Sequence, residues 1–314
     1  MFRKLVLSGL CLLLPAMALA GQPRYAVDAP PGQRLDVGGY KLHIHCQGRG
    51  TPTIILDAGV GGFSLEWLPV QRALSAHTRV CAYDRAGYGW SDMGPLPRTT
   101  ARISNELQRL LAAATVRPPY ILVGHSFGGY SVQHYARSNP DKVAGMVLIE
   151  ASHPEQVQRL PQYRQPRRPA PGGRRVALLR QLRLHPNYPE PYVALAYQLI
   201  TTWKTAMTVH EEMEHFPRSA EQVRQAGELP DVPLLVLTRG LRVWPHTAYG
   251  DAMEFTWMAL QDELAGLDAD AVHLIAEHSG HSIHMDEPGL VVNAINTLLN
   301  RIDNKDTYAR HDGP

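Results

Sequence analysis

One serine in this chain is placed where its hydroxyl could act as a nucleophile. Ser126 is the centre of Gly-His-Ser-Phe-Gly, residues 124–128, which follows an apolar run rich in β-forming residues and precedes a helix-compatible segment from Tyr130. A serine exposed on such a strand–turn–helix needs a tight, strained turn, where side chains two positions away would clash. Gly124 and Gly128 remove those side chains. The pattern predicts a nucleophilic serine that requires a histidine and a carboxylate from elsewhere; the alternative is a glycine-rich turn with a surface serine.

Apolar strands and amphipathic helices alternate on both sides of this turn. Thr99–Ala114, for example, repeats its apolar residues at helical spacing. The alternation is typical of a mostly parallel sheet covered by helices on both faces. With 314 residues, of which 44% are hydrophobic, the chain can bury one large core of this kind with an inserted subdomain. The predicted strands around the turn are Thr53–Asp57, Arg79–Tyr83, Tyr120–Val123, Val143–Ile149, Leu234–Thr238 and Val272–Ala276.

Changes in composition divide the chain into segments. Residues 1–20 combine a short basic start, an apolar stretch and a small-residue cleavage site. They predict a secretory signal peptide, and therefore a secreted or periplasmic protein with no stable membrane insertion after cleavage; the alternative is a retained N-terminal anchor. The other predicted segments are a linker at 21–33, a core at 34–154 and 231–303, a helical insertion at 155–230 that interrupts it, and a polar tail at 304–314.

The helical insertion begins with an unusually basic stretch. Arg159–Arg183 carries eight arginines and no acidic residue, interleaved with proline and glycine. It could be a positively charged lid that attracts anionic substrates or a membrane surface, or a solvated loop, and the composition favours the loop. Pro191–Met207, further along, is predicted to be helical and apolar enough to roof a pocket.

Net charge and cysteine content limit the partners and the compartment. The formal charge is +2, and removing Arg3 and Lys4 with the predicted signal peptide leaves a neutral chain. Such a chain gives no electrostatic reason to expect nucleic-acid binding. Cleavage also leaves only Cys46 and Cys81, which in an oxidising compartment form either one disulfide or two buried thiols on core strands. The oligomeric state stays open.

Four blocks of sequence together resemble the α/β-hydrolase-fold superfamily, in its serine-nucleophile, esterase- and lipase-like branch. The resemblance extends from about Asp36 to Ile302. It implies an eight-stranded, mostly parallel sheet with an inserted helical cap, and a triad in the chain order nucleophile, acid, histidine. The blocks, in the family's order, are Leu56-Asp57-Ala58-Gly59, Tyr83-Asp84-Arg85-Ala86-Gly87-Tyr88-Gly89-Trp90-Ser91, Gly124-His125-Ser126-Phe127-Gly128-Gly129 and Ser279-Gly280-His281.

The resemblance assigns the nucleophile to Ser126 and the general base to His281, which follows a glycine as the family's histidine does. His278 and His284 flank His281 at spacings of three residues. His284 is the rival base. A metal cluster of the three histidines is not expected, because the helical zinc motif places its histidines four residues apart.

The acid departs from the family's commoner pattern. Most members place an aspartate shortly after the seventh strand, but here no carboxylate follows that strand before Asp251. Glu150, at the end of the sixth strand, matches the alternative position used by some members, including certain haloalkane dehalogenases. The carboxyl end of a strand at the active edge of the sheet would let this carboxylate reach the imidazole. We therefore expect Glu150 to be the acid, with Asp251 as the second choice and a solvated turn carboxylate as the alternative for Glu150.

The resemblance also implies an oxyanion hole, formed by the backbone N–H groups of Val60 and Phe127, and no cofactor. The expected function is cleavage of an ester-like acyl bond in a small molecule. Lactonase, amidase, aminopeptidase and C–C bond hydrolase activities remain open, because they share this triad, and so does a non-catalytic ligand-binding role. Dehalogenase and epoxide hydrolase activities are disfavoured, because their alkyl-enzyme ester needs a carboxylate at position 126.

Overall fold

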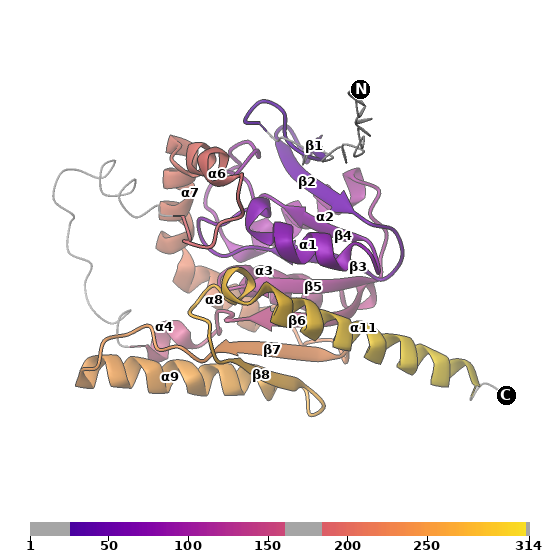
Figure 1. Cartoon of the computed structure of the whole chain (residues 1–314), viewed down its shortest axis with the longest axis vertical. Helices are drawn as coiled ribbons and strands as arrows, with labels where there is room; N and C mark the ends of the chain where they lie inside the picture. Colours follow the sequence, from indigo (N-terminus) through magenta and orange to yellow (C-terminus); the bar gives the residue numbers. More distant parts are fainter. Residues whose placement is uncertain (1–25, 161–183, 312–314) are drawn as a thin grey trace, which may run out of the picture.

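An eight-stranded, mostly parallel sheet forms the centre of the molecule, as predicted (Figure 1). This computed structural model describes residues 26–160 and 184–311, with side chains up to residue 303. The predicted signal peptide and residues 161–183 of the arginine-rich stretch lie outside the described residues. The strands are β1 (Gln33–Asp36), β2 (Lys41–Gln47), β3 (Thr53–Asp57), β4 (Val80–Tyr83), β5 (Tyr120–His125), β6 (Val143–Ile149), β7 (Leu234–Arg239) and β8 (Val272–Ala276).

The order of the strands in space places a crevice beside the serine turn. The sheet runs β1-β2-β4-β3-β5-β6-β7-β8; β1 and β2 pair antiparallel to their neighbours, and the other pairs are parallel. After β3 the chain moves outward to β4 and then returns to place β5 on the other side of β3. At such a reversal the loops that follow the two strands part and leave a crevice at their carboxyl ends. The serine turn after β5 and the glycine loop after β3 therefore meet at one edge of the sheet.

Helices cover both faces of the sheet because its strands are apolar on both sides. Alternate residues of β3 divide between two cores: Ile55 packs with α2 and α3, and Ile54 and Leu56 pack with α1 and α11. The closing helix α11 extends from Pro288 to His311. The core helices are η1 (Ser64–Trp67), α1 (Leu68–Leu74), α2 (Thr100–Ala113), α3 (Gly128–Ser138), η2 (Pro140–Lys142), α9 (Ala248–Ala265), α10 (Ile283–Asp286) and α11 (Pro288–His311).

A group of helices between β6 and β7 lies over the loops at the active edge of the sheet (Figure 1). The predicted helical segment Pro191–Met207 is divided between two of them, because the Thr202 side chain accepts a hydrogen bond from the Thr205 N–H and begins a new helix. Phe216 and Val223 of the last one pack on Phe127, beside the serine. These helices are α4 (Gln156–Arg159), α6 (Val193–Ile200), α7 (Trp203–Glu214) and α8 (Phe216–Gln225).

The two cysteines left open by the sequence form a disulfide. Cys46 on β2 and Cys81 on β4 are directly opposite each other in the antiparallel pairing of these strands, and their sulfur atoms are bonded. The bond joins the antiparallel edge of the sheet to its parallel part.

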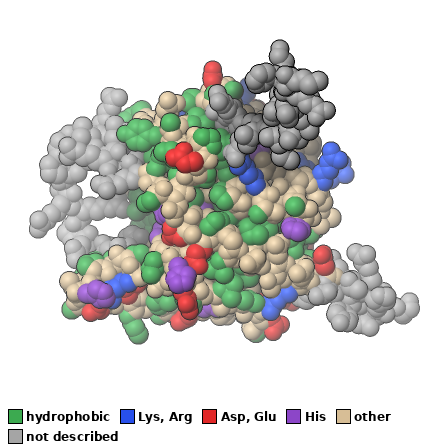
Figure 2. All heavy atoms as spheres, viewed as in Figure 1, with side chains coloured by type: hydrophobic (Ala, Val, Ile, Leu, Met, Phe, Trp, Pro, Cys, Tyr) green, Lys and Arg blue, Asp and Glu red, His purple; other side chains and the backbone are tan. Residues whose placement is uncertain are grey.

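The surface carries mixed charges. On the face shown in Figure 2, Lys and Arg side chains lie at scattered positions among acidic, apolar and polar ones. No helix in the described part of the chain combines the length and the apolar character needed to cross a membrane.

Candidate active site

The turn between β5 and α3 holds Ser126 in a strained conformation. Its φ of 51° lies in the left-handed region, which non-glycine residues rarely adopt. A Cβ atom at Gly124 would lie 2.7 Å from the carbonyl oxygen of Gly128, and one at Gly128 would lie 2.5 Å from the carbonyl oxygen of Asp57. Both distances are shorter than a Cβ tolerates, so the turn requires glycine at both positions, as the sequence pattern predicts.

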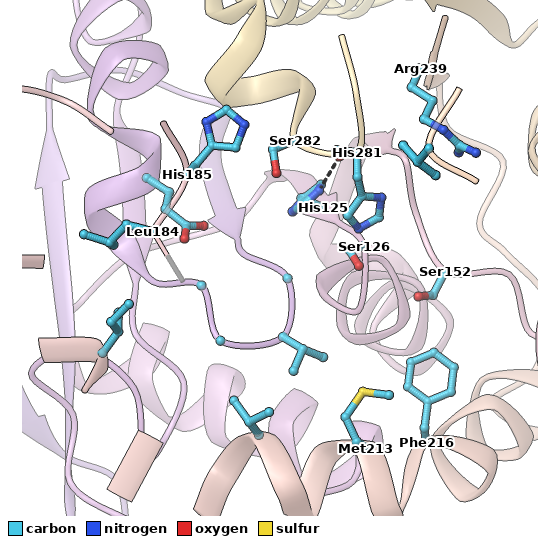
Figure 3. Close-up of a pocket in the computed structure, with 18 of the residues that line it drawn as sticks. His125, Ser126, Ser152, Leu184, His185, Met213, Phe216, Arg239, His281 and Ser282 are labelled. Atoms are coloured by element: carbon cyan, nitrogen blue, oxygen red, sulfur yellow. Dashed lines mark hydrogen bonds between the residues drawn. The ribbon is translucent and has the colours of Figure 1, made fainter. Parts of the chain in front are cut away.

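Ser126 and His281 line the same cavity, which has a volume of about 750 Å³. Figure 3 shows the His281 imidazole next to the Ser126 side chain, with Ser152 on the other side of the serine. His281 follows β8, and its side chain is 44% exposed. Within the described residues, the Ser126 hydroxyl forms no direct hydrogen bond with the imidazole. Such bonds are often long in unliganded enzymes and shorten when substrate binds.

The side chain of Glu150 is completely buried and contacts the imidazole directly. Its Oε2 lies 3.2 Å from Nδ1 of His281. Glu150 also has a left-handed backbone conformation, with φ of 46°, immediately after the end of β6. Burial opposes the charged form of this carboxyl, but the hydrogen bond and charge of His281 and the charge of Arg239 outweigh it, so the pKa of Glu150 lies below its usual value. Glu150 is therefore an ionised carboxylate, and it accepts a hydrogen bond from the Nδ1–H group of His281.

Three further donors hold the Glu150 carboxylate in place. Arg239, the last residue of β7, donates its backbone N–H to Oε1 and its Nη1 to Oε2, each at 2.9 Å. The indole N–H of Trp257, on α9, lies 3.1 Å from both oxygens. The other arm of Arg239 binds Glu254 at 2.7 Å. The sequence analysis missed these partners, although the position of Arg239 at the end of the strand next to β6 was a usable signal.

The other candidates for the acid and the base lie in different positions. Asp251 is in the first turn of α9, where its carboxylate pairs with Arg242 and is 61% exposed, and it does not line the cavity. His284 is 1% exposed; its ring stacks on Trp67 and lies tilted against the ring of His125. Burial and the neighbouring His281 lower the pKa of His284 to about 3. His278 is exposed, and its backbone N–H donates to a glutamate carboxylate.

His125, inside the serine motif, was not assigned a role in the sequence analysis. Its Nε2 donates to the backbone carbonyl of His281 at 2.8 Å (dashed line in Figure 3), which fixes the loop that carries His281. Burial, together with His284 and His281, lowers the pKa of His125 well below its ordinary value. The ring is therefore neutral, and it forms part of the cavity wall.

The loop after β3 presents the second predicted oxyanion donor, Val60. Arg85, which is 2% exposed, donates to the carbonyl of Ala58 and, at 2.8 Å, to the carbonyl of Gly59. In a trans peptide the C=O and N–H point in opposite directions, so the Val60 N–H points away from Arg85. The backbone N–H groups of Val60 and Phe127 have no acceptor among the described residues, so both can donate to a ligand.

Arg85 also connects this loop to the helices that cover the site. Its Nη1 binds Asp57 at 2.7 Å, and its Nε binds Glu212, on α7, at 2.9 Å. Burial disfavours the charged guanidinium, but Glu212 and Asp57 outweigh this and hold the pKa of Arg85 above its ordinary value. Glu212 also accepts from the hydroxyl of Tyr88 at 2.7 Å. This buried network joins the cap, the glycine loop and the loop after β4.

In residues 26–160 and 184–303, no three His, Cys, Asp or Glu side chains are grouped so that they could hold a metal ion.

Comparison with known proteins identifies the family. Residues 45–294 match the alpha/beta hydrolase family. The chain belongs to this family. The hydrolase is 28% identical to the uncharacterized protein YqjL of Bacillus subtilis (strain 168) over 261 residues, which cover 82% of this chain and 88% of the relative.

Solved structures of hydrolases share the fold. The enol-lactonase from Burkholderia xenovorans LB400 superposes with a TM-score of 0.60 and 21% identity, over 83% of this chain and 97% of that one. The haloalkane dehalogenase DatA from Agrobacterium tumefaciens C58 superposes with a TM-score of 0.63 and 20% identity, over 89% of this chain and the whole of that one. At these identities the likeness shows the fold alone, since one fold supports different reactions. The chemistry of this hydrolase has to be argued from its own residues.

Proposed function

We propose that this hydrolase cleaves an ester-like acyl bond, with Ser126 as nucleophile, His281 as general base and Glu150 as the acid that orients the histidine. The observation that carries the proposal is the 3.2 Å contact between the buried Glu150 carboxylate and Nδ1 of His281, at the wall of the cavity that Ser126 also lines. This contact fixes the tautomer in which Nε2 is unprotonated and can accept the serine proton.

The reaction proceeds in two halves. Ser126 Oγ attacks the substrate carbonyl carbon while Nε2 of His281 takes the serine proton, and Glu150 stabilises the imidazolium that forms. The N–H groups of Val60 and Phe127 bind the negative charge on the tetrahedral oxygen. His281 then gives the proton to the leaving alcohol, and the acyl group remains on Ser126. His281 takes a proton from a water molecule as the water attacks the acyl-enzyme. It then gives this proton to Oγ of Ser126 as the bond between Oγ and the acyl carbon breaks, which releases the acid and restores the serine.

The nature of residue 126 separates this chemistry from that of other members of the fold. A serine gives a carboxylic ester with the acyl group of the substrate, which water can hydrolyse through the same triad. Lactones, amides and C–C bonds beside a carbonyl would react through the same steps, so they are the alternative substrates. A non-catalytic role in ligand binding would use the same cavity without acylation of Ser126.

An activity screen of the purified mature protein tests the proposal. The panel comprises aryl esters of graded acyl length, lactones and amides, assayed with the parent protein and with Ser126→Ala. We expect ester hydrolysis by the parent and a loss of kcat on the order of 10⁴- to 10⁶-fold in the variant. Full turnover by Ser126→Ala on every ester that the parent cleaves would contradict the mechanism.

We also propose that the protein acts outside the cytoplasm. The proposal rests on the signal-peptide pattern of residues 1–20, and the disulfide between Cys46 and Cys81 supports it, because disulfides persist in oxidising compartments. N-terminal sequencing of protein from the periplasm and the medium tests it; a retained N-terminus in the cytoplasmic fraction would contradict it.

A further inference from the structure

A second carboxylate, that of Glu66, lies in the wall of the same cavity. Glu66 belongs to the short helix η1, directly after the glycine loop that carries Val60. Its side chain is 20% exposed. A Cβ atom at Gly62 would lie 2.5 Å from Oε2 of Glu66, so a larger residue at position 62 would make this side chain move from its present position. In this position the Glu66 carboxylate forms part of the cavity wall.

Glu66 has no hydrogen-bond donor among the described residues. The nearest polar contact is Nε2 of His284, at 3.7 Å, which is too long for a hydrogen bond. His284 does not balance the charge either, because burial and its neighbours His281 and His185 lower its pKa to about 3 and leave the ring neutral. Both ring nitrogens of His284 also lack a partner. A partly buried carboxylate with no donor has lost some of its contact with water and gained no hydrogen bond in return, so a ligand that supplies a donor would stabilise it.

The other charged groups near Glu66 are already engaged. The Arg85 guanidinium is bound by Asp57 and Glu212. His185, which lines the cavity, faces Asp286 at 3.3 Å.

Glu66 is the only carboxylate among the described residues that line the cavity. The buried Asp84 acts on it through its like charge, but the contacts of Asp84 are with His43 and with backbone N–H groups. Because Arg85 is already paired with two other acids, an ionised Glu66 favours a cation over an anion in this part of the cavity. The rest of the wall is largely apolar and includes Leu184, Ile200, Val209 and Met213.

We propose that Glu66 binds a protonated amine of the substrate, so that the enzyme prefers esters with an apolar body and a basic nitrogen over uncharged esters of the same length. This inference rests on the proposed esterase function for its kinetic consequence, but the amine site itself does not depend on it. An ammonium group would donate charge-assisted hydrogen bonds to Glu66, and its hydrocarbon chain would lie against the apolar wall.

The preference depends on pH in a defined direction. Burial, opposed by the charges of Arg85 and His185, raises the pKa of Glu66 to about 7. The carboxyl is therefore neutral below this pH and ionised above it. Amine binding should be weak at pH 6 and strong at pH 8, where an alkylamine is still protonated. Uncharged esters of matched length control for the effect of pH on Ser126 and His281.

Two measurements on the full-length mature protein test the site. The first compares kcat/KM for p-nitrophenyl aminoalkanoates of six to eight carbons with the matched alkanoates, and for aminoalkyl butyrates with alkyl butyrates. The second measures binding of hexylammonium and of 1-hexanol by calorimetry, which needs no hydrolysis. Both are repeated with Glu66→Gln and with Asp251→Asn, which removes a negative charge from the exposed surface.

We expect the amine to be preferred by about 10- to 100-fold at pH 8 in at least one ester series and in binding. Glu66→Gln should bring these ratios close to one, and Asp251→Asn should leave them as in the parent. Amine binding that depends on Glu66 without hydrolysis of any ester would support the site and contradict the proposed function. Ester hydrolysis without an amine preference in any series, or a preference that survives Glu66→Gln, would overturn the site.

Discussion

Replacing Glu150 with glutamine would remove the negative charge beside His281 while preserving the size of the side chain. The carboxylate accepts from His281, from the indole of Trp257 and twice from Arg239. The NH₂ group of a glutamine would have to face at least one of these donors, because none of them can accept a hydrogen bond in its present state. The variant therefore loses both the charge and part of the hydrogen bonding that orient the imidazole.

The size of the effect follows from the role of the charge. Glu150 would stabilise the imidazolium that forms when His281 takes the serine proton, as the aspartate does in the serine-protease triad, where the corresponding amide substitution lowers kcat by about 10⁴. That factor equals about 5.4 kcal/mol at 1.36 kcal/mol per tenfold change. Breaking a buried ion pair typically costs about 3–5 kcal/mol of stability, and Arg239 keeps Glu254 as a second partner. We therefore expect a folded but destabilised variant.

The assay is steady-state hydrolysis of the ester that the parent cleaves best in the activity screen. Urea unfolding gives the fraction of each variant that is folded under the assay conditions. Asp251→Asn is the matched control, because it makes the same chemical change at an exposed carboxylate that lies outside the cavity. A folded Glu150→Gln variant with kcat within tenfold of the parent would refute the reasoning. A crippled Asp251→Asn variant beside an active Glu150→Gln variant would transfer the role to Asp251.

Two further predictions concern groups around the site. Glu212→Gln should weaken the ion pair that holds Arg85 and so displace the Val60 N–H, the proposed oxyanion donor after Gly59. We expect kcat to fall about tenfold or more with a smaller change in KM. A kcat equal to that of the parent would contradict this role. Replacing both Cys46 and Cys81 with alanine should lower the free energy of unfolding by about 4 kcal/mol, because the disulfide closes a loop of 35 residues. Urea unfolding of the oxidised parent and of the variant measures this difference. Identical urea midpoints would contradict the prediction.

The sequence predicted those parts of the molecule that depend on short-range patterns. The strand before Ser126, the helix after it and the two glycines belong to one continuous stretch, in which each residue type has a local steric reason. Strands β3 to β7 were found for the same kind of reason, because buried strands are continuous apolar runs. Glu150 could be proposed as well, since it directly follows such a run and the ends of parallel strands meet at one edge of the sheet.

Contacts between distant parts of the chain could not be predicted in this way. Arg85 and Glu212 are 127 residues apart, and the cap helix that carries Glu212 has no motif to indicate which of its faces meets the core. Arg239 and Glu150 are 89 residues apart, and only the strand order makes them neighbours. The environment of the Glu66 carboxylate could not be predicted either, because its lack of a hydrogen-bond donor depends on which distant residues lie around it.

The most direct test of the account is labelling with a fluorophosphonate, which reacts with a serine activated by a neighbouring base. Purified parent protein, Ser126→Ala and Glu150→Gln are incubated with the probe, and the adduct is located by peptide mass spectrometry. The account predicts rapid labelling of the parent at Ser126, no labelling of folded Ser126→Ala and greatly slowed labelling of Glu150→Gln. A folded parent protein that takes up no label, or a label located at a different residue, would contradict the claim that Ser126 is an activated nucleophile.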